Sequence, residues 1–225
     1  MPEKDQKAAV SQPAVEVEDL KFGYGTAPVI AIERFRLEQS ETCALIGPSG
    51  CGKSTFVHLL AGLLTAVAGS VKILGQDLAG LSETERDRFR GRHVGFVFQR
   101  FHLMPALSVR ENLIIAQRLA RAERSSTHID ALLERLGLGG LDHRKPGALS
   151  QGQAQRAALA RALVHKPELV IADEPTSALD DDNAKEALAL LGEVAAESGA
   201  ALLIVTHDHR VRGHLSRDFD MSAPT

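Results

Sequence analysis

Residues 42–60 read TCALIGPSGCGKSTFVHLL, and this stretch decides the fold. The apolar residues at 42–46 predict a short buried strand, and a glycine-rich turn then leads into a helix that begins near Lys53. The turn fits the pattern G-x-x-x-x-G-K-[ST], in which successive backbone N–H groups face phosphate oxygens. The helix after it adds the positive end of its dipole. The stretch therefore predicts a phosphate-binding loop between a strand and a helix.

The polar side chains of this loop suit a nucleoside triphosphate. Lys53 is expected to neutralise the β- and γ-phosphates, and the hydroxyl of Ser54 to coordinate Mg²⁺. A glycine-rich turn without a ligand is the alternative, and the strand and helix that flank the turn argue against it. The residues expected to hold the nucleotide are Gly47, Pro48, Ser49, Gly50, Cys51, Gly52, Lys53, Ser54 and Thr55.

A second apolar strand ends in two acidic residues, Asp173 and Glu174. The carboxyl ends of parallel strands face the ligand crevice of an open α/β sheet. We expect Asp173 to hold the hydration shell of Mg²⁺, and Glu174 to orient or deprotonate the water that attacks the γ-phosphate. A solvated turn before Pro175 is the alternative. The phosphate-binding loop earlier in the chain favours the catalytic interpretation.

Strand-like and helix-like patterns alternate along the chain, and helical patterns cluster in its middle. The expected strands are 15–20, 29–37, 42–46, 71–74, 93–98, 168–172 and 201–206, and the expected helices are 53–63, 108–121, 129–136, 150–165 and 183–197. This order predicts an α/β fold: a P-loop NTPase core with a mainly parallel sheet, N-terminal antiparallel β strands and an inserted α-helical subdomain.

The same order predicts one domain over residues 14–215. Its α/β core is expected at 14–98 and 166–215, and the helical subdomain at about 99–165. Residues 1–13 mix charged residues with Gln, Ala and Pro, so they are expected to be a flexible tail without a signal peptide. Residues 216–225 are expected to be a second tail.

Composition and charge limit the classes of partner. The net charge is −3 and no basic patch is evident, so nucleic-acid binding is not expected. Cys43 and Cys51 are the only cysteines, which favours a reducing cytosol over a disulfide scaffold or zinc site. Residues 54–71 lack Lys, Arg, Asp and Glu, but their polar and glycine positions favour a buried helix and turn over a membrane span. Direct membrane insertion is therefore not expected.

Five further segments, in order, resemble the ATP-binding cassette (ABC) family, and the resemblance runs from about residue 15 to 208. They are Tyr24, where the family has an aromatic that stacks on adenine; Gln99, the Q-loop glutamine; 149–153 (LSQGQ), the signature; 177–180, the D-loop; and His207, the switch histidine. The resemblance implies that Gln99 contacts the metal and water and senses a membrane partner, and that His207 contacts the γ-phosphate. It implies nucleotide contacts for Ser150, Gly152, Gln153 and Asp180.

Several of these residues also have ordinary structural interpretations. Ser150 and Gln153 form a capping box, which the following helix would favour whatever its function. The two interpretations are compatible, because a capped, positive helix end is a good phosphate ligand. Gln99 also fits a polar residue at the end of a strand. Tyr24 lies between two glycines and also fits a turn aromatic.

Two segments leave further alternatives open. His207, with the Asp-His pair at 208–209, suggests a metal site, but such a site needs a third ligand and none is evident nearby. Gln151 stands where the family usually has glycine, and its side chain would crowd the phosphate of a partner's ATP while its backbone N–H stays available. Residues 210–225 lack the hairpin that the family commonly carries, and no structure is assigned to them.

The resemblance implies a mechanism, its partners and a location. Two copies would meet head to tail, with each ATP held by the Lys53 loop of one copy and the Ser150 helix end of the other. ATP and Mg²⁺ are the implied cofactors. Closing and opening of the dimer would drive a separate transmembrane permease, placing the chain in the cytoplasm at the inner (plasma) membrane. The alternatives are a soluble non-transport ABC ATPase, an import-type ABC ATPase and a non-hydrolysing nucleotide-binding module.

One region points to a branch of the family. Residues 92–105 (RHVGFVFQRFHLMP) and 108–113 (SVRENL) are similar to the ATPases of lipoprotein-release and macrolide-export transporters. Those ATPases drive extracytoplasmic work through a membrane subunit. The similarity implies that residues 101–104 lie near a groove that receives a helix of that subunit. Packing inside the helical subdomain is the alternative for these mostly apolar residues.

Overall fold

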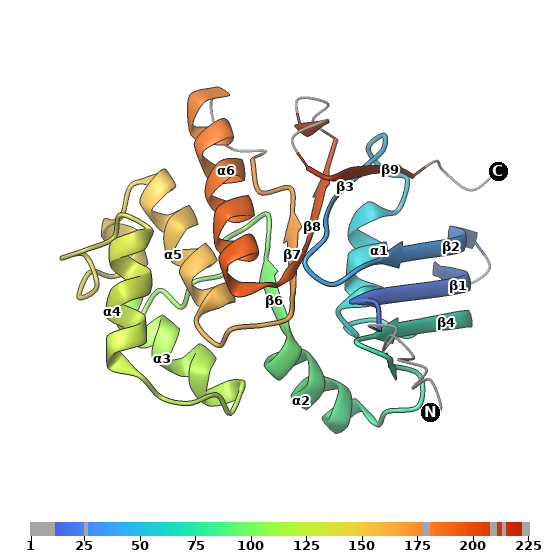
Figure 1. Ribbon diagram of the computed structural model, residues 1–225, viewed down its shortest axis with the longest axis horizontal. Helices are drawn as coiled ribbons and strands as arrows, with labels where there is room; N and C mark the ends of the chain where they lie inside the picture. The colour runs from blue at the N-terminus through green and yellow to red at the C-terminus, as the bar shows by residue number, and fades with distance from the viewer. Residues whose placement is uncertain (1–11, 25–26, 177–180, 208–210, 213–214, 222–225) are drawn as a thin grey trace, which may run out of the picture.

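A five-stranded parallel sheet forms the centre of the molecule (Figure 1). The computed structural model describes residues 12–24, 27–176, 181–207, 211–212 and 215–221. In spatial order the strands are β6 (Val94–Val97), β7 (Leu169–Asp173), β8 (Ala201–Thr206), β3 (Thr42–Ile46) and β9 (Arg217–Asp220). All pairs are parallel, so the carboxyl ends of the strands meet at one edge of the sheet.

A second sheet of four antiparallel strands lies on one side of the first (Figure 1). Its spatial order is β2 (Ala27–Leu37), β1 (Val15–Tyr24), β4 (Ala68–Ile73) and β5 (Gln76–Asp77). Helix α1 (Lys53–Leu60) packs between the two sheets, and Phe56 on this helix is fully buried against Phe35 of β2. The antiparallel strands therefore cover the helix that follows the phosphate-binding turn.

Alternate residues of the parallel sheet enter two different cores. Leu45, Leu203 and Val205 join the core that contains α1 and the antiparallel sheet. Ala44, Ile46 and Ile204 join the core formed with the remaining helices. Both faces of the sheet are thus covered, which explains why β3, β6, β7 and β8 are apolar at nearly every position rather than at every second one.

The other helices are α2 (Glu83–His93), α3 (Val109–Leu119), α4 (Ser126–Arg135), α5 (Gln151–Leu163) and α6 (Asp181–Ser198), with a short 3₁₀ turn, η1 (Pro146–Ala148), before α5. Figure 1 shows α3, α4 and α5 grouped on the side away from the antiparallel sheet. Ser108 and Ser150 cap α3 and α5 in capping boxes, as the sequence predicts. These observations and the two sheets confirm the predicted fold class.

Besides the two-residue strand β5 and the short turn η1, helix α2 and strand β9 were not expected from the sequence. Helix α2 has no buried residue and a strongly polar composition, so it carries no apolar periodicity, although Ser82 caps it in a capping box with Glu85. Strand β9 lies within residues 216–225, which were expected to be a tail. This expectation was wrong, because Arg217–Asp220 pairs in parallel with Cys43–Ile46 of β3. Its sequence, RDFD, is too short and charged to show a strand pattern, and pairing at the edge of the sheet decides its structure.

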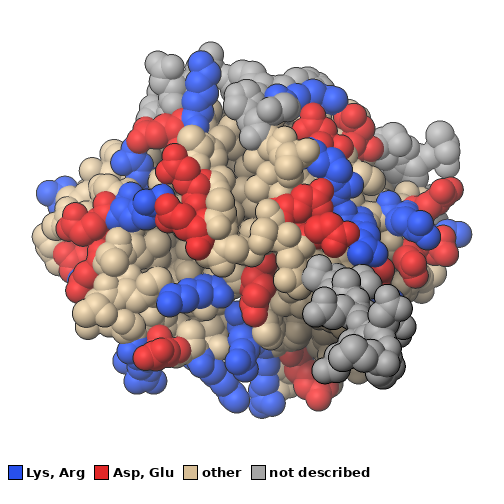
Figure 2. Space-filling view, in the orientation of Figure 1, with Lys and Arg blue, Asp and Glu red and all other residues tan. Residues whose placement is uncertain are grey.

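Within the described residues, no helix is long and apolar enough to cross a membrane. Figure 2 shows acidic and basic side chains interspersed over the face that it presents.

Candidate nucleotide site

The phosphate-binding turn joins β3 to α1 at the carboxyl edge of the parallel sheet. Gly52 caps α1 in a left-handed conformation, with φ of 99°, and a Cβ atom there would lie 2.9 Å from the carbonyl oxygen of Val29. A Cβ atom on Gly47 would collide with the carbonyl oxygen of Met221. Only glycine fits these two positions, so the chain can make the tight turn that a loop with N–H groups facing an anion requires.

Lys53 is held over this loop. Its Nζ donates to the carbonyl oxygens of Gly47 at 2.8 Å and Pro48 at 3.0 Å. The residue is 7% exposed, so its stem is packed and the ammonium group has little freedom. The positive charge therefore stands next to the backbone groups that would surround a phosphate.

The structure brings Ser54 and Asp173 together across 119 positions of sequence. The Ser54 hydroxyl donates to Oδ1 of Asp173 at 3.4 Å, from the first turn of α1 to the end of β7. Asp173 is 7% exposed, and burial raises its pKa above the ordinary value, while the hydrogen bond from Ser54 opposes that shift. A hydroxyl and a buried carboxylate are oxygen donors that suit a hard dication such as Mg²⁺.

We expect Asp173→Asn to raise the melting temperature of the nucleotide-free protein at neutral pH. The raised pKa means that ionised Asp173 is less stable in the folded chain than in the unfolded chain. This penalty is complete above the folded pKa and absent below the unfolded pKa, so the gain should disappear below about pH 4. Thermal melts at neutral and acid pH measure it. A variant that melts lower than the wild type at neutral pH would contradict it.

Glu174 adopts a conformation that is rare for its type. Its φ is 50°, although it has a side chain and precedes Pro175, and both features disfavour this region. Its backbone N–H donates to Val205 O at 2.8 Å. Its carboxylate, 11% exposed, accepts from Thr206 Oγ1 at 3.3 Å and from the backbone N–H of His207 at 3.1 Å. The ring Nδ1 of His207 lies 2.8 Å from the same carboxylate.

Most of these residues line one open cleft of about 360 Å³, a volume within the range of ligand pockets. Its lining consists of Val29, Ser49, Gly50, Gly52, Lys53, Ser54, Thr55, Gln99, Glu174 and His207. The cleft therefore unites the phosphate-binding loop, the Q-loop glutamine and the ends of β7 and β8. Cys51, in contrast, is buried under the loop at 1% exposure.

Other candidate residues lie elsewhere. Among the described residues, Ser150, Gly152 and Gln153 do not line the cleft; they begin α5, on the other side of the parallel sheet from the antiparallel strands (Figure 1). Tyr24 is 61% exposed, also outside the cleft lining, and packs edge-on against Phe22. Asp180, with the rest of 177–180, lies outside the described residues.

Sequence reasoning missed Val29 and Thr206. Val29 lines the cleft from β2, and Thr206 supports Glu174 with its hydroxyl while being fully buried. A buried hydroxyl directly before His207, at the end of an apolar strand, was the available signal for Thr206. The side chain of Gln151, the departure from the signature, is exposed at the start of α5.

Comparisons with known proteins agree with this geometry. Residues 33–177 match the sequence family described as ABC transporter. The lipoprotein-releasing system ATP-binding protein LolD of Hydrogenovibrio crunogenus is 42% identical over 197 residues, which cover 87% of this chain and 86% of LolD. The macrolide export ATP-binding/permease protein MacB of Escherichia coli is 40% identical over 213 residues, which cover 92% of this chain but 33% of MacB.

A solved structure matches over nearly the whole chain. It is the dimeric ATP-binding cassette MJ0796 in a post-hydrolysis state bound to ADP and Pi, with a TM-score of 0.83 and 29% identity, covering 93% of this chain and 94% of MJ0796. The family match, the relatives and the cleft lead to one identification: the chain belongs to the ABC transporter family and is an ATP-binding, ATP-hydrolysing cassette.

Proposed function

We propose that this chain powers a transporter of the lipoprotein-release or export type, as one half of an ATP-sandwiched dimer that works on a separate membrane permease. The relatives support the branch, since LolD is named for lipoprotein release and MacB for macrolide export. One observation supports the dimer: the phosphate-binding loop lines the cleft, but the signature residues at the start of α5 do not. A second copy, related by a twofold axis, would supply that end.

Each residue of the cleft then has a task. Lys53 binds the β- and γ-phosphates, and the Ser150 end of α5 from the other copy binds the γ-phosphate from the opposite side. Glu174 orients the attacking water and accepts its proton, while His207 contacts the γ-phosphate and Gln99 the metal and water. Ser54, Gln99 and Asp173 would hold Mg²⁺, which neutralises charge on the phosphate oxygens when bound. Tyr24 would stack on adenine and Asp180 would approach the nucleotide.

A mixed-dimer experiment tests the shared site. Lys53→Met removes the phosphate ligand of one half-site, and Ser150→Arg blocks the helix end of the other, so each variant alone should be inactive. In a mixed dimer one site carries both changes and the other carries neither. Mixing equal amounts should restore about a quarter of wild-type ATPase activity, since about half of the dimers are mixed and each has one intact site.

The control and the opposing result are simple. Neither variant should gain activity when it is mixed with itself at the same total concentration. Mixtures that stay inactive, although native mass spectrometry shows mixed dimers, would contradict a site shared between copies.

The proposed permease partner and membrane location are inferred from the similarity to the lipoprotein-release and macrolide-export relatives. Residues 101–104 support docking there, since His102 and Met104 are exposed while Leu103 packs against the helical core. Asn112, fully buried, accepts from Met104 N at 2.8 Å and donates to Ser108 O at 2.9 Å, which fixes the shape of this loop.

Co-expression with a membrane protein encoded beside the chain should move the chain to the cytoplasmic face of the membrane fraction. A chain that stays unbound would support the soluble alternative, and a requirement for a substrate-binding protein would support import.

A further inference from the structure

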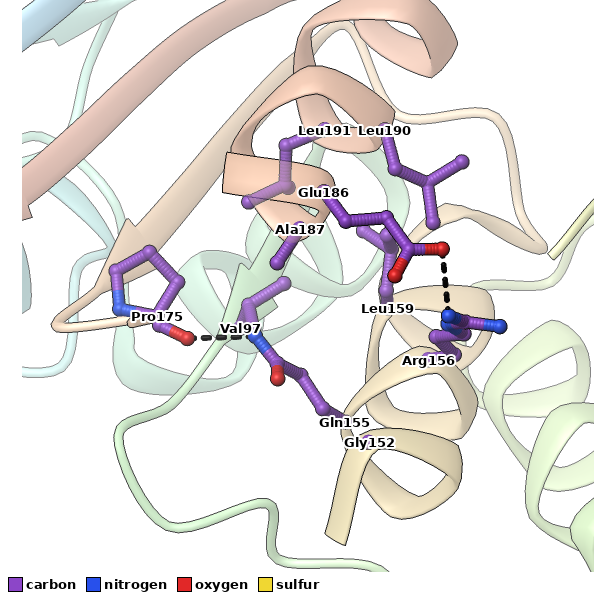
Figure 3. Close-up of a pocket in the computed structure, with 10 residues that line it drawn as sticks. All are labelled: Val97, Gly152, Gln155, Arg156, Leu159, Pro175, Glu186, Ala187, Leu190 and Leu191. Atoms are coloured by element: carbon purple, nitrogen blue, oxygen red, sulfur yellow. Dashed lines mark hydrogen bonds and ion pairs between the residues drawn. The ribbon is translucent and has the colours of Figure 1, made fainter. Parts of the chain in front are cut away.

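A second pocket lies between α5, the second and third turns of α6, and the turn after β7 (Figure 3). Gly152 of the signature lines it, as do Gln155, Arg156, Pro175 and Glu186. It is separate from the nucleotide cleft, because the two linings share no residue among those described. Two polar contacts cross it, and only one of them reaches the catalytic turn.

That contact is made by Gln155. Its side chain is 7% exposed, and its Nε2 donates to the carbonyl oxygen of Pro175 at 2.6 Å. Figure 3 shows the side chain reaching from α5 toward Pro175. Gln155 lies five residues after Ser150, the cap of α5. Through this hydrogen bond the signature helix is attached directly to the backbone that follows Glu174.

The backbone of this turn requires surrounding contacts to fix its conformation. Glu174 is left-handed and precedes a proline, a combination that costs conformational free energy and persists only when surrounding contacts fix it. The bond from Glu174 N to Val205 O holds the turn on one side. The bond from Gln155 to Pro175 O holds it on the other side, one residue from Glu174, whose carboxylate is proposed to face the attacking water.

We propose that Gln155 is a positioning residue, which acts through Pro175 to set the carboxylate of Glu174 for hydrolysis. The proposal rests on the proposed catalytic role of Glu174. The Gln155 contact would also connect two sites within one copy. The first is the Ser150 end of α5, which is proposed to bind the ATP of the other copy, and the second is the catalytic turn after β7. Gln155 does not line the nucleotide cleft, so its loss should change the rate of hydrolysis rather than the binding of ATP.

The test replaces Gln155 by Leu, which keeps a similar volume and removes the donor, and by Glu, which keeps the length and cannot donate when ionised. Both variants should lower kcat on the order of 10- to 100-fold, because small misplacements of catalytic groups have effects of this size. The KM for ATP should stay within about twofold of the wild-type value. The matched control is Glu186→Leu, which removes the other polar contact of the same pocket, the Arg156–Glu186 ion pair of 2.7 Å, and should leave kcat unchanged.

A double variant separates positioning from general stability. In a Glu174→Gln background, Gln155→Leu should lower the residual kcat by less than about twofold, since residues that act as one unit are not additive. The proposal is overturned if Gln155→Leu and Gln155→Glu both keep wild-type kcat, if they raise KM instead, or if kcat falls equally in both backgrounds. If Gln155→Leu melts below the assay temperature, Gln155→Glu alone decides. A wild-type chain that fails to hydrolyse ATP would refute the proposed function instead.

Discussion

Glu174→Gln should bind ATP, accumulate as a dimer and lose turnover by about 10²- to 10⁴-fold, the range for removal of a general base. Glutamine keeps the size of the side chain and can still contact Thr206 and His207, so the cleft should keep its shape. It cannot accept the proton of the attacking water. Because ATP makes contacts that exist only in the closed dimer, unhydrolysed ATP should hold that state.

Single-turnover assays and size-exclusion chromatography with MgATP measure the two effects of Glu174→Gln. Glu168→Gln is the matched control. It makes the same change at the residue before the start of β7, where the exposed side chain pairs with His93. That control should hydrolyse ATP at the wild-type rate and show no trapped dimer. Undiminished turnover in Glu174→Gln would remove Glu174 from the mechanism.

Lys53→Met should weaken ATP binding by on the order of 100-fold and reduce turnover at least as much. Methionine keeps the apolar stem packed but removes the ammonium group, and with it the bonds to Gly47 O and Pro48 O. The loop then loses both its phosphate ligand and the contacts that hold its shape. Isothermal titration with a non-hydrolysable ATP analogue measures the affinity.

A second lysine provides the control for Lys53→Met. Lys72 lies on β4 and pairs with Glu16 at the surface, so Lys72→Met removes an ammonium group of the same kind away from the cleft. Its ATP affinity should match that of the wild type. An affinity of Lys53→Met within about threefold of wild type would refute the phosphate role of Lys53.

Local patterns account for the features that the sequence predicted best. The bounds of β3 and β8 match the predicted strands, because both are short apolar runs that end at a turn or a polar residue. The capping boxes at Ser108 and Ser150 depend only on residues three positions apart, so they too can be recognised directly. Strand β9 had no such local pattern and was missed. Helix α2 was missed because it has no apolar period, although Ser82 and Glu85 do form a capping box.

By itself the sequence determined the parallel core, the phosphate-binding loop and the acidic pair. Its resemblance to the ABC family led to the prediction that two copies form a dimer. The tertiary structure decided which distant groups meet: Ser54 with Asp173, Thr206 with Glu174, and Gln155 with Pro175. The reason is physical. Helix and turn formation depend on near neighbours in sequence, whereas these contacts depend on the order and register in which β7 pairs with β8, and β8 with β3, at one edge of the sheet.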